Sequence, residues 1–374
     1  MKKLWHSIKY KRYARHRANR SFSRGLRLKH LQKASRRADQ GIPRWERKGR
    51  NRLKHQPYEN IWAPTMFSFV DNPEGVSAFI AHVDKCFHTR TPVHIVLLYV
   101  ETLTYDGVAV LLSAMARFRA NRIPFNGDFP HNLDARRIIA GSGFFESLYD
   151  TYQTAFREHD SYEPPGNDGV FARRMRRVDS ELGARIIQAA SRTVWGENRR
   201  CTGVQRTLIE LMHNTNNHAS PSEPGKLDWV LSVNHVQEDH KVAFSFVDYG
   251  VGVLRSLDYK PRGSKFFGAI GKLLSRFWPK IMHGGEPEIL RLIFDGEMHL
   301  TVTGKDYRGR GLPGIYEAFK AGHFSDFVMI TNGALYDSRN NTYRELSTPF
   351  SGTFIYWTLN PHNRSLPDAF TDTD

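Results

Sequence analysis

The sequence has little cysteine and no long apolar run. Cys86 and Cys201 are its two cysteines among 374 residues, and their spacing fits neither a metal-binding pair nor a disulfide framework. The longest apolar runs, such as Ile95 to Val100, are too short to cross a bilayer. The basic N-terminus lacks the apolar segment of a secretory signal. We therefore expect a cytoplasmic protein with no transmembrane segment.

Positive charge is concentrated in one segment. Residues 1–55 contain 20 Lys and Arg and two acidic residues, a net charge of +18, whereas the remainder has 34 basic and 36 acidic residues, a net charge of −2. This segment has too few apolar residues to bury a core of its own. We expect a basic N-terminal arm that binds nucleic acid or another polyanion. An anionic membrane surface, a docking protein and an inert tail are the alternatives.

Changes in composition divide the rest of the chain, whose length suits two or three domains. Pro-containing and polar stretches read as linkers between folded regions. The expected divisions are a linker over 56–65, a folded region over 66–150, a linker over 151–169, a folded region over 170–361 and a tail over 362–374.

The first folded region alternates strands with helices, which predicts a small α/β sheet with right-handed crossovers. The expected strands are 66–70, 93–100 and 123–129, and the expected helices are 73–88, 107–121 and 133–142. The strand VHIVLLYV, the turn TLTYDGV before a long helix, and ARRIIAGSGFF resemble a sulfate-transporter and anti-sigma-antagonist (STAS) domain. That resemblance implies a protein partner.

A STAS domain carries its regulatory Ser or Thr directly before the glycine that opens this helix. Here Thr104, Tyr105 and Asp106 precede Gly107, so that hydroxyl is missing. We expect a docking module without a phosphorylation switch, with substitution by Thr104 or Tyr105 as the alternative.

The second folded region contains LIELMHNTNNHA, residues 208–219. Glu210 and Asn214 are four residues apart, so a helix places both on one face. Asn217 and His218 belong to a polar cluster at the end of this stretch, and Asn disfavours helix interiors. The pattern indicates a binding site; a helix end capped by Asn is the alternative.

Two later segments combine glycine with polar groups. Residues 244–252 read FSFVDYGVG. A strand-like apolar run is followed by Asp248 and then by Gly250 and Gly252. A buried carboxylate suits an amino-heterocycle, and glycine lets the backbone approach a flat ring. In GKDYRGRGLPGI, residues 304–315, glycines precede a helix-like segment. The free N–H groups and the dipole of a helix start favour phosphate.

In this order and spacing, residues 170–361 resemble the GHKL superfamily of histidine kinase-like ATPases. Glu210 and Asn214 match its N box, residues 248–252 its first glycine box, residues 309–314 its second, and Gly352-Thr353 its terminal strand. The resemblance implies an α/β sandwich with a mixed sheet that binds ATP and Mg²⁺. Tyr249 departs from the usual Asn or Asp, and Pro313 lies at a helix start, where proline is tolerated.

The resemblance also implies roles for residues. Asn214 would ligate Mg²⁺, Glu210 would be the general base, and Asp248 would bind the adenine amine, with the second glycine box facing the phosphates. The expected nucleotide-binding residues are Asn214, Asn217, His218, Asp248, Gly250, Gly252, Lys305, Arg308, Gly309, Arg310, Gly311, Leu312, Gly314 and Thr353.

The remaining elements of the second region follow from periodicity. We expect an amphipathic helix over 170–194 before the helix of Glu210 and Asn214. The segment over 254–300 corresponds to the ATP lid of the family. The expected strands are 228–236, 241–247, 327–331 and 353–359.

Three functions remain open. The first is slow Mg²⁺-dependent ATP hydrolysis that drives dimerisation or lid closure, so that a homodimer is one expectation. The second is a Ser/Thr or His protein kinase in a partner-switching system; the helix expected over 170–194 contains no His, which disfavours a two-component sensor kinase. The third is an ATP-gated interaction module that does not hydrolyse ATP and holds nucleic acid through its arm.

Overall fold

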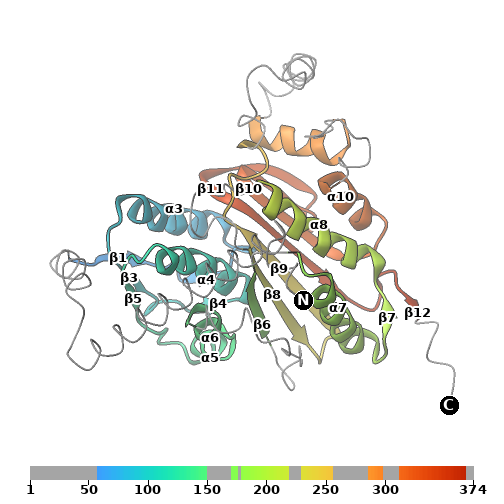
Figure 1. Ribbon diagram of the computed structural model, residues 1–374, viewed down its shortest axis with the longest axis horizontal. Coiled ribbons are helices and arrows are strands. Elements are labelled where there is room, and N and C mark those ends of the chain that lie inside the picture. Colours follow the sequence, from blue (N-terminus) through green and yellow to red (C-terminus); the bar gives the residue numbers. More distant parts are fainter. Residues whose placement is uncertain are drawn as a thin grey trace, which may run out of the picture. The chain divides into compact units, whose positions relative to one another are not determined.

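The computed structural model describes residues 57–149, 170–175, 178–218, 229–255, 285–297 and 311–367. The basic arm, the linker expected over 151–169 and most of the expected lid lie outside these residues. Tyr58–Asp374 forms one compact unit. Its fold is mixed α/β with parallel and antiparallel sheets, as expected at that level (Figure 1).

The first region contains a parallel three-stranded sheet in the order β1-β3-β5. A small α/β sheet was expected here, but strand β1 lies at residues 59–62, where a linker was expected, and the strand expected from residue 66 belongs to a different pair. Strands β2 and β4 form a separate parallel pair. The strands are shorter than expected, because turns begin early. The strands are β1 (Glu59–Trp62), β2 (Met66–Phe67), β3 (Val93–Val96), β4 (Thr102–Leu103) and β5 (Phe125–Gly127).

Three helices of this region lie within a few residues of their expected positions, and a fourth, over 144–149, was not expected. Asn72 begins α3 by accepting from the N–H of Gly75 at 3.1 Å, and Arg90 ends it in the left-handed conformation. Asn132 caps α5 in the same way. The helices are α3 (Pro73–Thr89), α4 (Tyr105–Ala120), α5 (Leu133–Gly141) and α6 (Phe144–Tyr149).

The second region contains a five-stranded sheet in the order β10-β11-β9-β8-β6. Its strand pairings among the described residues are all antiparallel, whereas a mixed sheet was expected. Hairpins account for two of these pairings, β8 with β9 and β10 with β11. The strands are β6 (Val170–Met175), β8 (Trp229–Val236), β9 (Lys241–Asp248), β10 (Ser325–Asp337) and β11 (Thr342–Leu359).

The single helix expected over 170–194 is wrong. Residues 170–175 are strand β6, which pairs with β8, and helix α7 (Ser180–Trp195) begins ten residues later than expected. Asp179 determines this start, because its carboxylate accepts from the N–H of Leu182 at 2.9 Å. The remaining elements here are β7 (Arg199–Arg200), α8 (Thr202–His218), a helix over 285–294, α10 (Gly311–Lys320) and β12 (Leu366–Pro367).

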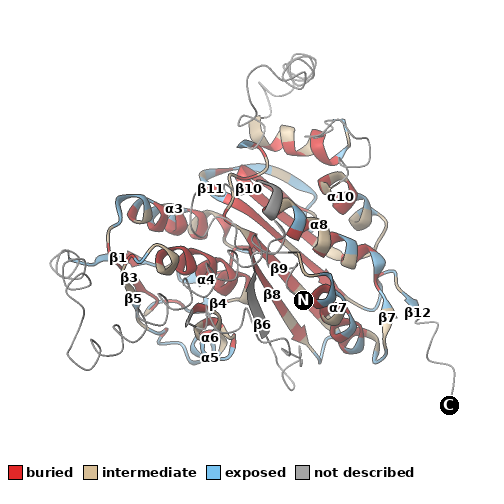
Figure 2. Ribbon diagram, viewed as in Figure 1, coloured by how far each residue is buried: buried red, intermediate tan, exposed pale blue. Residues whose placement is uncertain are grey.

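The five-stranded sheet is covered by helices on both faces (Figure 1). One core joins α7, α8 and α10 to the sheet face that carries Phe244 and Phe246. A second core joins α3 and α4 to the opposite face, which carries Val247 and Phe354. Buried positions follow both helix layers and the sheet between them (Figure 2). Helices of the first region therefore cover one face of the second region's sheet, and the division of the two regions into separate domains stays a prediction.

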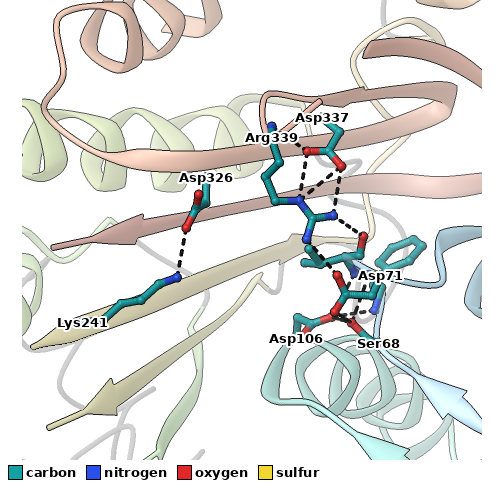
Figure 3. A network of polar contacts seen from close by, with 9 residues as sticks. Ser68, Asp71, Asp106, Lys241, Asp326, Asp337 and Arg339 are labelled. Atoms are coloured by element: carbon teal, nitrogen blue, oxygen red, sulfur yellow. Dashed lines mark hydrogen bonds and ion pairs between the residues drawn. The ribbon is translucent and has the colours of Figure 1, made fainter. Parts of the chain in front are cut away.

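Polar contacts join the same two regions (Figure 3). The Arg339 guanidinium, in the turn between β10 and β11, contacts Asp337 at 2.9 Å and Asp71 of the first region at 2.8 Å. Asp106 at the start of α4 is buried and accepts from the N–H groups of Phe69 and Val70. These contacts hold the 68–71 turn against the hairpin.

Neither cysteine forms a disulfide, since both Cys86 and Cys201 are free and buried. Among the helices in the described part of the chain, none combines the length and apolar character needed to cross a bilayer.

Candidate functional site

Helix α8 presents Glu210 and Asn214 on one face, as their spacing predicts. Its opposite, apolar face is fully buried through Leu208 and Met212, so the orientation of the helix is determined by the core. Glu210 and Asn214 are half-buried. Both side chains therefore lie at the edge of the core, where polar groups can meet a ligand.

The N-terminus of α10 lies against these two side chains. A Cβ atom on Gly311 would be 3.3 Å from Nδ2 of Asn214 and 3.6 Å from Oε2 of Glu210. Glycine at this position leaves room beside the carboxamide and the carboxylate. The first N–H groups of a helix have no partner within the helix, so this end attracts anions.

Other residues of α10 anchor it. Leu312 and Gly314 are buried, and Leu312 belongs to the core shared with α8. The side chain of Leu312 was expected near the nucleotide, but its contacts are with the core. Phe294 of the 285–294 helix stacks on Tyr316 with ring centroids 4.5 Å apart. Together these contacts hold the helix start in place beside α8.

Asp248 is the last residue of β9, the central strand of the sheet. Burial raises the pKa of its carboxyl to about 7, although the Thr215 hydroxyl and the N–H of Gly250 counteract the rise. Its Oδ1 is buried and accepts no hydrogen bond from the described residues. Such an oxygen is costly unless a ligand satisfies it. A carboxyl with this pKa in this position is therefore a binding-site candidate.

Thr215 links Asp248 to the other two predicted residues. It follows Asn214 directly in α8, and its hydroxyl lies close enough to Asp248 to affect the carboxyl pKa. The structure therefore brings Glu210, Asn214, Asp248 and Gly311 into one neighbourhood.

The neighbouring strand completes the sheet around Asp248. Thr353 of β11 lies directly opposite Asp248 in the antiparallel register. Its hydroxyl is 3.3 Å from the Thr331 hydroxyl, which also donates to the carbonyl of Gly352 at 3.1 Å. A Cβ on Gly250 would lie 3.2 Å from Oδ1 of Asp248, so glycine keeps that oxygen uncrowded.

The loop after Asp248 is held by a residue whose role the sequence did not reveal. Asn332 lies at an irregularity in the β10–β11 pairing and has a left-handed backbone, φ 53°. Its side-chain oxygen accepts from the N–H groups of Leu254 and Arg255, and its amide donates to the carbonyl of Val251. An Asn at a strand irregularity is a weak sequence signal, and these partners are about 80 residues away along the chain.

Several expected site residues lie outside the described part of the chain. These are Lys305, Arg308, Gly309 and Arg310, together with the side chains of Asn217 and His218. No group of three His, Cys, Asp or Glu side chains that could hold a metal occurs among the described residues. A cation at this site would take its remaining ligands from water or from the bound molecule.

The arrangement supplies three kinds of polar group. Asp248 offers an unsatisfied buried acceptor, Glu210 and Asn214 offer a carboxylate and an amide oxygen, and the start of α10 offers N–H groups. An amine at one end of a ligand and an anion at the other match these features.

No protein-family model matches the chain, and no curated protein matches it.

Proposed function

We propose that this chain binds ATP with Mg²⁺ in a GHKL-like site and hydrolyses it slowly. One observation carries the proposal: Gly311, which begins α10, lies against Asn214 and Glu210 of α8, while Thr215 of the same helix neighbours Asp248. Three segments that the sequence separates by up to about 100 residues therefore supply complementary parts of one site.

The buried Oδ1 of Asp248 supports adenine as the group at one end. An exocyclic amine donates to a carboxylate, and a partner for this oxygen would remove the cost of leaving it unsatisfied. Gly250 leaves the space beside it open. A flat heterocycle fits a place where a glycine backbone, not a side chain, borders the carboxylate.

The start of α10 and the residues facing it support a polyphosphate at the other end. Asn214 would offer one amide oxygen to Mg²⁺, and that ion, when bound, would neutralise phosphate charge. Glu210 would take a proton from the attacking water. The Gly311 N–H at the helix start would orient the phosphates.

The STAS-like character of the first region adds a proposal about partners. We propose that it docks a protein, and that the cytoplasm, where ATP is plentiful, is the compartment in which the chain works. A homodimer formed on ATP binding is part of the same proposal.

Incubation of the purified protein with ATP labelled at the γ-phosphate tests the function. Hydrolysis predicts release of labelled phosphate by the wild type and its loss in Glu210→Gln, while Glu210→Gln still retains bound ATP. His213→Ala is the matched control, because His213 is exposed on the same helix. Label on the protein instead would indicate a kinase, retained ATP with neither product would indicate a binding module, and no retained ATP would refute the site.

A further inference from the structure

Asp248 and Tyr249 are neighbours in the chain but belong to opposite faces of the sheet. Phe244 and Phe246 of β9 lie in the core with α7, α8 and α10, so Asp248 shares their face by the alternation of a strand. Tyr249 lies in the other core, with α3 and α4. A shift of one of these residues moves the backbone that carries the other.

Tyr249 is buried, with 3% of its surface exposed. The Arg117 guanidinium of α4 lies 4.4 Å from the centre of its ring. Phe350 of β11 packs edge-on against the same ring at 5.3 Å. A cation above the face of a tyrosine is attracted by the ring, and more strongly when both are out of water.

Arg117 is itself fixed from two other directions. Its guanidinium lies 4.2 Å from the centre of the Phe87 ring and pairs with Asp84 at 2.5 Å. Phe87 and Asp84 both belong to α3. The charges are buried, with 7% and 8% of the Arg117 and Asp84 side chains exposed. Arg117 thus joins the two helices of one layer to the residue that follows Asp248.

Two buried polar atoms around Arg117 lack hydrogen-bond partners. The Tyr249 hydroxyl and Oδ2 of Asp84 are buried without a hydrogen-bond partner among the described residues. Burying two charges costs desolvation free energy, and well-packed apolar residues in their place often give equal or greater stability. A buried ion pair is therefore weak evidence of a role in stability alone. A donor and an acceptor left unpaired beside it add to that cost.

We infer that Arg117 is a positioning residue for Asp248. By holding the Tyr249 ring, Arg117 fixes the backbone that carries Asp248, so that the α3–α4 layer sets the affinity of the proposed nucleotide site. The inference rests on the proposed function for its ligand. It also accounts for Tyr249 at a place where the family that the sequence resembles usually has Asn or Asp, because a guanidinium can stack on an aromatic ring.

The test compares the double variant Asp84→Leu/Arg117→Met with Ile139→Ala. The double variant removes both charges together and keeps the apolar volume, so that no unpaired charge remains to unfold the protein. Ile139 is a buried α5 residue of the same core, and its truncation controls for lost stability. The readouts are ATP affinity by calorimetry, amide hydrogen exchange over 248–255, and Tm.

The double variant is expected to bind ATP about tenfold more weakly and to exchange its 248–255 amides faster. Ile139→Ala is expected to lower Tm without either change. Equal affinity and equal exchange in the double variant and the wild type would overturn the inference. If the wild type itself fails to bind ATP, the proposed function fails, and the exchange comparison still decides whether Arg117 positions the Asp248 loop.

Discussion

The side chain of Asn332 fills the space into which a side chain at position 252 would project. Gly252 has φ 77°, and a Cβ there would lie 2.4 Å from the Asn332 carboxamide. Glycine adopts a positive φ without strain, and it alone leaves that space free because it has no Cβ. Asn332 uses the space to bind the backbone of Val251, Leu254 and Arg255.

Asn332→Ala therefore leaves two N–H groups and one carbonyl without their partner. We expect the free energy of unfolding to fall by about 1–3 kcal/mol and amide exchange over 251–255 to rise. Asn341→Ala is the control, because Asn341 also has a left-handed backbone but is exposed in a turn. Equal losses of stability for the two variants, measured by urea unfolding, would show that only the backbone conformation matters.

The carboxyl of Asp248 makes stability depend on pH. Its pKa is about 7 in the folded chain because of burial, above the ordinary 3.8. Between these values the folded state holds a proton that the unfolded state has released, so this group lowers stability as pH rises from about 4 to about 7. Asp248→Asn should remove that dependence.

We accordingly expect Asp248→Asn to be more stable than the wild type by about 4 kcal/mol at pH 8, with a smaller gain at pH 5. Urea unfolding at both values measures the difference. A gain that does not grow with pH would mean that the carboxyl is not held in its neutral form by burial.

Asn214→Ala removes the amide oxygen proposed for Mg²⁺. We expect Mg²⁺ to strengthen ATP binding in the wild type, and this strengthening to fall about tenfold or more in the variant, a loss of about 1.4 kcal/mol. Titrations with Mg²⁺ and with EDTA measure it. His213→Ala, one residue earlier and exposed, should keep the full Mg²⁺ dependence; the same loss there would make the effect a general property of α8.

The basic arm should account for any retention on nucleic acid or heparin. Deletion of residues 1–55 removes a net charge of +18, and binding through released counterions falls steeply with salt. We expect retention to disappear in the shortened chain and to fall with salt in the full one. Unchanged retention after the deletion would assign polyanion binding to the folded part.

Local patterns predicted local structure well. The periodicity of α3 and α4 and the alternation of β8 and β9 located these elements to within a few residues. The four-residue spacing of Glu210 and Asn214 correctly placed both on one side of α8. The prediction of a helix over 170–175 failed because Phe171, Met175 and Val178 continue the helical spacing of apolar residues in α7. Nothing short of the pairing with β8 distinguishes that strand.

Long-range contacts were beyond the sequence for a physical reason. Val247 and Phe354 of the five-stranded sheet pack against α3 and α4. The identity of an apolar residue does not indicate which helices will cover it. The contact of Arg117 with the Tyr249 ring and the contact of Asn332 with the backbone around Gly252 both join segments more than 75 residues apart. Single-sequence spacing contains no signal at that range.

Equilibrium binding of ATP to the wild type and to Asp248→Asn tests the central claim most directly. Asp239→Asn is the matched control, since Asp239 is exposed in the turn that leads into β9. The account predicts saturable Mg²⁺-dependent binding by the wild type and Asp239→Asn, and at least a tenfold loss, about 1.4 kcal/mol, in Asp248→Asn. No saturable binding by the wild type, or equal binding by all three, would contradict it.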